Sequence, residues 1–304
     1  MPFIKKAFYI EKPIKTFLFL IREFNFTQGE AQRVISKGRI LIDGKSIYDK
    51  SATIEGHIEI VYFEPKSRGL KPIFITDKFL VFDKPSGVLV HPNSMATEYS
   101  ILDEIRIHSG ANANATHRID METSGLLLAS RDKDAERFLK GSFERKTIKK
   151  GYLAWVDGRV DKSFSVEEPI KIRDDYSASK HKVEISKNGK YAKTDFIPLY
   201  YDEKLDTTLI ECYPLTGRTH QIRIHLFHVK HRILGDPIYG TTFKDANSYL
   251  EGTLSKEDRL IATKATRLLL HANSISFNYG CRYKIFSKVN FRKMRSEIYR
   301  GREI

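Results

Sequence analysis

The segment His117–Leu128 reads HRIDMETSGLLL and places a carboxylate, Asp120, two positions after the guanidinium of Arg118. In an extended backbone, side chains two positions apart lie on the same side. A nearby cation keeps an aspartate ionised, which suits a nucleophile or a base rather than a proton donor. The residues Thr-Ser-Gly at 123–125 can form a turn that fixes Asp120 at a surface edge, because Gly125 permits backbone angles that side chains forbid. Taken alone, the segment also fits a surface Arg-Asp pair ahead of a buried strand.

A second polar cluster, Leu215–Leu226 (LTGRTHQIRIHL), alternates in a way that could form a strand with Arg223 on its polar face. We favour a helix that begins near Thr219, its expected N-cap. The mixed polar and apolar pattern continues to Lys230 and stops before the Gly-Asp-Pro turn at 235–237. In either case, a rigid element holds Arg223 where it can meet a distant carboxylate.

Three histidines of this cluster, His220, His225 and His228, raise the question of a metal site. The sequence gives them no acidic or cysteine partner at a matching spacing, so we expect no metal. Histidines satisfied by hydrogen bonds in an amphipathic helix are the simpler interpretation. Glu122 is a conceivable second carboxylate beside Asp120, but we interpret it as structural. A glycosidase that uses a pair of carboxylates as acid and base is therefore disfavoured.

The 304 residues carry a formal net charge of +14, which favours a polyanionic partner such as RNA or DNA. The composition is 41% hydrophobic and has no apolar run of membrane length, so we expect a globular protein without a membrane partner. Two cysteines outside any ligand spacing and no signal-peptide pattern predict a cytoplasmic protein, and we expect a monomer. Positive charge gathers in two clusters: Lys140, Arg145, Lys146, Lys149 and Lys150, and the tail residues Arg282, Lys284, Lys288, Arg292, Lys293, Arg295, Arg300 and Arg302.

Residues 1–65 predict a separate small domain. Its expected elements are helices at 15–24 and 28–36, a strand at 39–45 that runs into an Asp-Gly turn, and a strand at 58–63. Thr27 and Glu30 have the spacing of a capping box at the start of the second helix. Two helices before a basic hairpin are the order of S4 RNA-binding domains, and the segment EAQRVISKGRILIDGK resembles that motif closely. Another small α+β module is the alternative. Residues 66–71 read as a linker.

Residues 72–304 predict a larger domain with many alternating strands, few helices and no βαβ periodicity. We therefore expect an α+β fold built on a mixed, mostly antiparallel β-sheet. Its expected elements are strands at 73–75, 79–82, 125–129 and 152–156, a helix capped by Asp132 that ends near Phe143, and a hairpin of 191–201 with 207–213. The strand at 125–129 begins directly after the Asp120 segment, so it would fix the position of that carboxylate.

Five motifs occur in the order found in RluA-type pseudouridine synthases, and the chain resembles that family over nearly its whole length. They are DKPSGVLVHP, HRIDMETSGLLL, KKGYLAWVDG, LTGRTHQIRIHL followed by HRILGDPIYG, and RLLLHA. With an S4-like domain in front, the chain is similar to the subgroup that acts on large-subunit ribosomal RNA. The resemblance implies a pseudouridine synthase fold for residues 72–304, ending in a basic tail. It also implies an enzyme that isomerises specific uridines of large-subunit (23S) ribosomal RNA to pseudouridine.

The resemblance further implies roles for single residues. Asp120 matches the catalytic aspartate that attacks the flipped uridine, after which the base detaches, rotates and rejoins the ribose through carbon. Tyr152 matches the tyrosine that packs against the base and takes part in proton handling, and Arg223 matches the arginine that pairs with the aspartate. Arg118 matches the arginine that enters the space left by the flipped nucleotide. RNA-binding or base-flipping roles are expected for His117, Arg118, Thr123, Arg218, Lys37 and Arg39. No cofactor is expected, because isomerisation needs no redox group and no second substrate.

Two alternatives share the positive charge and the S4-like segment. One is the same chemistry on tRNA, because family members share the active site and differ in peripheral RNA contacts. The other is a non-catalytic S4-type RNA-binding or ribosome-assembly protein. The joint presence of Asp120, Tyr152 and Arg223 argues against this second alternative. Whether Asp120 attacks the ribose or the base is open at this point.

Overall fold

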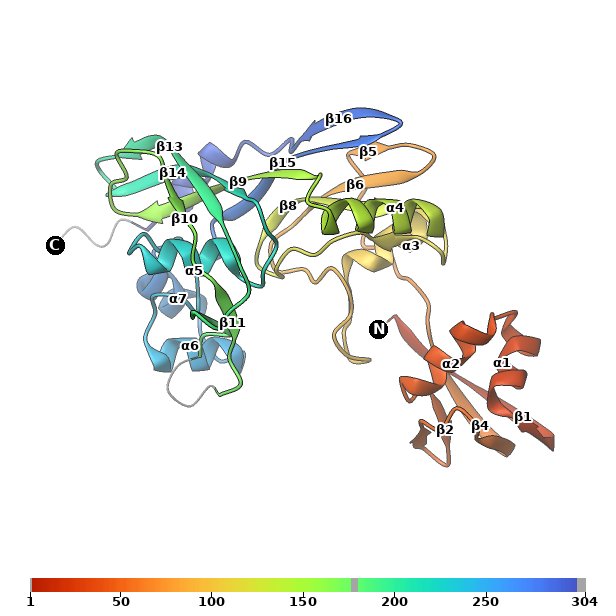
Figure 1. Ribbon diagram of the computed structural model, residues 1–304. Coiled ribbons are helices and arrows are strands. Elements are labelled where there is room, and N and C mark those ends of the chain that lie inside the picture. The colour runs from red at the N-terminus through yellow and green to blue at the C-terminus, as the bar shows by residue number, and fades with distance from the viewer. Residues whose placement is uncertain (1, 176–179, 300–304) are drawn as a thin grey trace. The chain divides into compact units, whose positions relative to one another are not determined.

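The computed structural model describes residues 2–175 and 180–299. The chain divides into two compact units, which we describe separately (Figure 1). The N-terminal unit contains the residues up to Arg68 together with Pro92–Tyr99, and the C-terminal unit contains Gly69–His91 and the residues from Ser100 onward. Within the described residues, no helix is long and apolar enough to cross a bilayer.

The elements of the N-terminal unit are β1 (Phe3–Lys15), α1 (Thr16–Phe24), α2 (Gln28–Ser36), β2 (Ile40–Ile42), β3 (Lys45–Ile47) and β4 (Thr53–Phe63). The four strands form one antiparallel sheet in the order β1-β4-β2-β3. The capping box of α2 is confirmed, because the side chains of Thr27 and Glu30 each accept the backbone N–H of the other. Asp43 and Gly44 both have positive φ, as the predicted Asp-Gly hairpin turn requires. Strand β1 was not predicted, because lysines and a glutamate interrupt its apolar alternation.

The strands of the C-terminal unit are β5 (Phe74–Ile75), β6 (Phe79–Lys84), β7 (Asn114–Ala115), β8 (Ser124–Ser130), β9 (Lys149–Asp157), β10 (Phe164–Val166), β11 (Ile170–Ile172), β12 (Val183–Ile185), β13 (Thr194–Asp202), β14 (Thr207–Pro214), β15 (Leu270–Tyr279) and β16 (Cys281–Phe286). A ten-stranded sheet follows the path β10-β13-β14-β9-β15-β8-β6-β5, with β16 paired to β15 and β7 to β8. Strands β8 and β15 pair in parallel and their neighbours pair antiparallel. The expected α+β class with a mixed, mostly antiparallel sheet is confirmed.

The helices of the C-terminal unit are α3 (Ile101–Ser109), α4 (Lys133–Glu144), α5 (Gln221–His228), α6 (Phe243–Leu250), α7 (Lys256–Thr263) and a 3-10 helix, η1 (Phe291–Glu297). Helix α4 confirms the prediction for 133–143, and the Asp132 carboxylate accepts the N–H of Ala135 at 2.8 Å. Helices α3, α6 and α7 were not predicted. Helices α6 and α7 are short and polar, but Thr242 and Ser255 cap them, a signal that the sequence did contain.

Strand β8 runs through the core of the C-terminal unit, and every one of its residues is buried. Gly125, its second residue, has a φ of +103°, and a Cβ at this position would lie 2.3 Å from the carbonyl oxygen of Ala272 on β15. Glycine is therefore required here both by the backbone angle and by the close approach of β15. Because β8 follows the Asp120 segment directly, the buried strand fixes the position at which that segment ends.

The basic C-terminal segment is partly built into the fold rather than being one solvated surface. The ring of Phe291 is buried, and Arg295 forms an ion pair with the buried Asp202. Arg300 and Arg302 lie outside the described residues. The expected contact of this segment with RNA stays a prediction.

Candidate active site

The two polar segments that the sequence singled out meet in one cleft of the C-terminal unit. The cleft has a volume of about 770 Å³, which lies in the range of sites that enclose a small organic ligand. Asp120 reaches the cleft from the loop before β8, Tyr152 from β9 and Arg223 from α5. Residues that are far apart in the sequence thus line one concave site.

Asp120 lies at the start of a tight turn. The N–H of Thr123 donates to the backbone carbonyl of Asp120 at 3.1 Å, so the turn spans 120–123. The predicted turn at 123–125 is wrong, because Ser124 already belongs to β8 and the backbone freedom of Gly125 serves the contact with β15. The side chain of Asp120 is 28% exposed and lines the cleft.

Lys84 supports this turn and was not singled out from the sequence. It is buried at the end of β6, and its Nζ donates to three backbone carbonyls, among them that of Met121 at 2.9 Å. Burial lowers the pKa of Lys84 to about 7, although the charges of Asp120 and Glu122 act in the opposite direction. The N–H of Gly87 donates to the same Met121 carbonyl at 2.9 Å, so the backbone of the turn is held from the β6 side.

Arg223 contacts two carboxylates at once. Its Nη1 donates to Oδ2 of Asp120 at 3.3 Å, and its Nε and Nη2 donate to the two oxygens of Asp236 at 2.7 and 2.8 Å. Asp236 is 1% exposed and also accepts the N–H groups of Ile238 and Tyr239. Burial raises the pKa of Asp236, but the charge and hydrogen bonds of Arg223 outweigh burial and lower it overall. The motif HRILGDPIYG contained this aspartate, but nothing in its spacing indicated that it would meet Arg223.

The helix predicted around Arg223 is confirmed, but its start was wrongly assigned. Helix α5 begins at Gln221, and its N-cap is His220 in a left-handed conformation with φ 52°, rather than Thr219. No side chain caps the helix, and the Oε1 of Gln221 instead accepts the N–H of Arg218, in the loop before the helix, at 3.0 Å. This local arrangement places His220 in the cleft.

His220 lies beside Asp120 and was not assigned to the site from the sequence. Its Nε2 is 3.9 Å from Oδ2 of Asp120, and its Nδ1 is hydrogen-bonded to the Tyr239 hydroxyl at 2.9 Å. Burial and the charge of Arg223 lower the pKa of His220 to about 4. The ring is therefore neutral at neutral pH, and Arg223 is the charged partner of Asp120.

Tyr152 lies in the middle of the sheet, where its β9 position pairs with Ala272 of β15 and with Cys212 of β14. The residue is 9% exposed and lines the cleft. Burial, together with the charge of Asp120, raises the pKa of Tyr152 above its ordinary range. The protonated phenol can offer a base both a ring face and an O–H donor.

Two of the expected RNA contacts lie at exposed positions of the cleft. Arg118 and Arg218 are both exposed and both line it. The Nε of Arg218 donates to the carbonyl of Tyr191 at 3.1 Å, which fixes the direction of its side chain. Of the first basic cluster, three lysines also line the cleft: Lys140, Lys146 and Lys150.

Two other expected contacts, His117 and Thr123, also line the cleft and have hydrogen bonds within the fold. The Nε2 of His117 accepts the N–H of Leu128 at 3.0 Å, and burial lowers the pKa of His117 to about 3. Thr123 is buried, and its N–H closes the Asp120 turn. Lys37 and Arg39 belong to the N-terminal unit, and their contact with RNA stays a prediction.

Comparison with known proteins agrees with this geometry. A family model described as RNA pseudouridylate synthase matches residues 78–228. A Helicobacter pylori (strain J99) protein named an uncharacterized RNA pseudouridine synthase is 40% identical over 297 residues, which cover 97% of this chain and 98% of that protein. The chain belongs to the RNA pseudouridylate synthase family. It is therefore an RNA pseudouridine synthase, and the expected isomerase class is confirmed.

Two further relatives in this family have names that specify an RNA. Ribosomal large subunit pseudouridine synthase C of Vibrio parahaemolyticus is 31% identical over 81% of this chain and 79% of its own length. The mitochondrial tRNA pseudouridine(32) synthase of Saccharomyces cerevisiae is 30% identical over 89% of this chain and 61% of its own length.

Proposed function

We propose that this pseudouridine synthase uses Asp120 as its nucleophile and acts on uridines of large-subunit ribosomal RNA. The observation that carries the proposal is the contact of Asp120 with Arg223, at 3.3 Å, inside a cleft that Tyr152 also lines. The buried guanidinium of Arg223 aims the carboxylate of Asp120 into the cleft, as covalent attack requires.

The reaction converts uridine into its carbon-linked isomer. The bond between C1′ of the ribose and N1 of uracil breaks, and a bond between C1′ and C5 forms. The proton on C5 is lost and N1 gains one, so the atoms balance without an oxidant, a reductant or a second substrate. We therefore assign no cofactor and no metal to the reaction. Asp120 is covalently bonded to one of the two separated parts, the ribose or the uracil, while the base rotates. This bond breaks again before the product leaves, which regenerates the carboxylate.

The target base must leave its helix to reach Asp120. Extruding a nucleotide costs a few kcal/mol, least where the base is unpaired. Stacking on an aromatic ring contributes about 1–3 kcal/mol per base, and Tyr152, which lines the cleft, would supply it. The exposed Arg118 at the cleft would occupy the space that the extruded base leaves.

The positive charge of the cleft suits a polyanionic substrate. The described lining of the cleft includes Arg118, Arg218, Lys140, Lys146 and Lys150 beside the carboxylates of Asp120 and Glu144, in a chain of net charge +14. The S4-like N-terminal unit, with Lys37 and Arg39, would add an independent RNA contact. For the enzyme itself, we propose a cytoplasmic location and a monomeric state.

The choice of large-subunit ribosomal RNA rests on the S4-like segment and on the relatives named ribosomal large subunit pseudouridine synthase. The tRNA relative supports a second candidate, the same isomerisation on tRNA. Isomerisation of ribosomal RNA and isomerisation of tRNA would use the same residues of the cleft. The cleft therefore does not distinguish between these two substrates. Peripheral contacts set the target in RNA-binding enzymes of this kind.

Mapping of pseudouridine across total RNA tests the proposal. Cells that lack this protein are compared with cells complemented by the wild type or by Asp120→Asn. We expect discrete large-subunit ribosomal RNA sites to be lost and then restored by the wild type alone. Loss of pseudouridine sites in tRNA alone would support the same chemistry and would change the proposed substrate from ribosomal RNA to tRNA. Restoration by Asp120→Asn would overturn the role of Asp120.

A further inference from the structure

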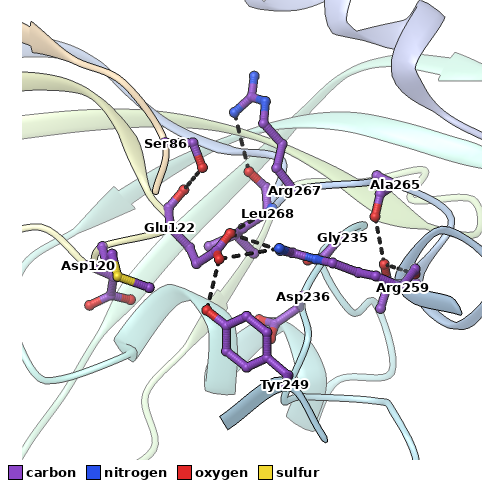
Figure 2. Close-up of polar contacts among 12 residues, drawn as sticks. Ser86, Asp120, Glu122, Gly235, Asp236, Tyr249, Arg259, Ala265, Arg267 and Leu268 are labelled. Carbon is purple, nitrogen blue, oxygen red and sulfur yellow. Dashed lines mark hydrogen bonds and ion pairs between the residues drawn. The ribbon is translucent and has the colours of Figure 1, made fainter. Parts of the chain in front are cut away.

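An ion pair joins Glu122, in the turn that Asp120 begins, to Arg259 (Figure 2). Glu122 accepts two N–H groups of Arg259 on α7, from Nη2 at 2.8 Å and from Nη1 at 3.3 Å. The hydroxyl of Tyr249 on α6 donates to the same carboxylate at 2.8 Å. The side chains of Glu122 and Arg259 are only 11% and 13% exposed. The described lining of the cleft includes none of these three residues.

Arg259 also reaches the segment that anchors Arg223. Its Nη2 donates to the carbonyl of Gly235 at 2.9 Å, and Gly235 directly precedes Asp236. Gly235 lies directly against the backbone of Arg267, because a Cβ there would lie 1.6 Å from the carbonyl oxygen of Arg267. One guanidinium thus joins the turn of Asp120 to the loop of Asp236.

The turn is held at Glu122 through both backbone and side chain. The Ser86 hydroxyl donates to the backbone carbonyl of Glu122 at 2.6 Å, while Arg259 and Tyr249 hold its carboxylate. Figure 2 shows the side chains of Asp120 and Glu122 leaving the turn on different sides. A shift of Glu122 would therefore move Asp120 as well, because the two residues belong to one hydrogen-bonded turn.

The charges of this cluster are consistent with a fixed ion pair. Burial raises the pKa of Glu122, but the hydrogen bonds and charge of Arg259 outweigh burial and lower it overall. Burial and the neighbouring charge of Glu122 raise the pKa of Tyr249, so its hydroxyl remains a donor. The guanidinium of Arg259 also lies over the ring of Tyr249, 5.4 Å from its centroid.

We propose that Arg259 is a positioning residue that sets Asp120 against Arg223, acting through Glu122 on one side and Gly235 on the other. The inference rests on the proposed role of Asp120. Its consequence is that the segment of α6 and α7, which supplies no described residue to the lining of the cleft, controls the rate of the chemical step. Misplacement of a reacting group by about 1 Å is enough to cost about 100-fold in rate.

The test compares the full-length wild type with Arg259→Gln on transcribed large-subunit ribosomal RNA. Three quantities are measured: the Kd for the RNA, the single-turnover rate constant at saturating enzyme, and the fraction of active enzyme from the burst amplitude. We expect the rate constant to fall about 10- to 100-fold, with Kd within about twofold of the wild type, since Arg259 does not line the cleft. A purely structural role would lower the active fraction and leave the rate constant unchanged, which would overturn the proposal.

Two further variants sharpen the comparison. Arg259→Lys keeps the charge and loses the two-point contact, so we expect it to recover part of the rate constant. Arg137→Gln is the matched control, because Arg137 forms an exposed ion pair with Asp134 on α4, and we expect the wild-type rate constant. If Arg259→Gln does not fold, Glu122→Gln weakens the same pair from the other side, and a wild-type rate constant in that variant would overturn the proposal.

Asp120→Asn separates the two claims. Activity in Asp120→Asn would overturn the proposed function, and the positioning role would fall with it. An inactive Asp120→Asn beside a wild-type rate constant in Arg259→Gln would overturn the positioning role alone.

Discussion

Asp236 accepts two hydrogen bonds from Arg223, at 2.7 and 2.8 Å, whereas Asp120 accepts one from the same guanidinium at 3.3 Å. The guanidinium is thus anchored to a fully buried carboxylate and offers only one edge to the cleft. A two-point contact fixes the plane of an arginine, so the direction of Nη1 does not depend on the charge of Asp120. Arg223 is therefore a preorganised partner for the proposed nucleophile, Asp120, and need not move during the proposed reaction.

Asp120→Asn is expected to abolish pseudouridine formation and to leave RNA affinity within about twofold of the wild type. The carbonyl of Asp120, not its side chain, closes the turn, so the fold should remain. The loss should be complete because an amide cannot replace a carboxylate nucleophile. Pseudouridine content of treated RNA and a filter-binding Kd provide the two measurements. Weakened binding in proportion to lost activity would contradict this expectation.

Asp236→Ala is expected to destabilise the fold by about 3–5 kcal/mol, because it leaves the buried charge of Arg223 without its main partner. Asp120→Ala, which removes a partly exposed carboxylate from the same arginine, should change stability by no more than about 1 kcal/mol. Urea unfolding of the two variants measures the difference. Equal losses would mean that the two carboxylates share Arg223 evenly, against the geometry.

Tyr152→Phe is expected to lower the single-turnover rate constant by about 100-fold if the phenol takes part in proton transfer. RNA affinity should stay the same, because the ring face remains available for stacking. Tyr152→Ala should weaken binding as well, by about 1–3 kcal/mol of lost stacking. A wild-type rate constant in Tyr152→Phe would mean that Tyr152 contributes only through its ring and that its hydroxyl takes no part in proton transfer.

Acid should destabilise the fold through three histidines. Burial lowers the pKa of His117 to about 3 and the pKa values of His220 and His271 to about 4. The unfolded chain binds these protons near pH 6.5, so between about pH 6.5 and 4 it holds more protons than the folded chain. The unfolding free energy should therefore fall as pH falls through this window, by about 1.4 kcal/mol per pH unit for each histidine.

Urea unfolding at pH 7.5, 6 and 5 measures this slope. The variant His117→Gln, whose amide oxygen can still accept the N–H of Leu128, should show a smaller decrease than the wild type. An identical decrease would remove His117 from the group of histidines responsible.

Local signals in the sequence predicted several elements of the fold. The capping box of Thr27 and Glu30, the cap of Asp132 and the buried strand after Asp120 all depend on a few neighbouring residues, and all three are confirmed. The presence of Arg223 on a helix was likewise readable from the polar pattern. The start of that helix was not, because His220 caps it in a left-handed conformation that L-residues seldom adopt.

The supports of the site could not be predicted, because they are contacts between distant segments. Asp236 meets Arg223 across a loop, Lys84 reaches Met121, and Arg259 meets Glu122 from 137 positions away. Nothing in the local pattern of a lysine or an arginine shows that its charge will be buried. Such pairings depend on the tertiary fold, which brings the β6 end and helix α7 to the same turn.

The parallel pairing of β8 with β15 has a consequence for how the enzyme forms. Ser124 is hydrogen-bonded to His271, 147 positions later, and Gly125 pairs with Ala272. The strand that follows Asp120 therefore has no neighbour on that side until the ribosome has synthesised β15. Contacts of such long sequence separation form late and slowly. A nascent chain can thus fold its N-terminal unit first, whereas the sheet that carries the cleft is complete only after β15 has been synthesised.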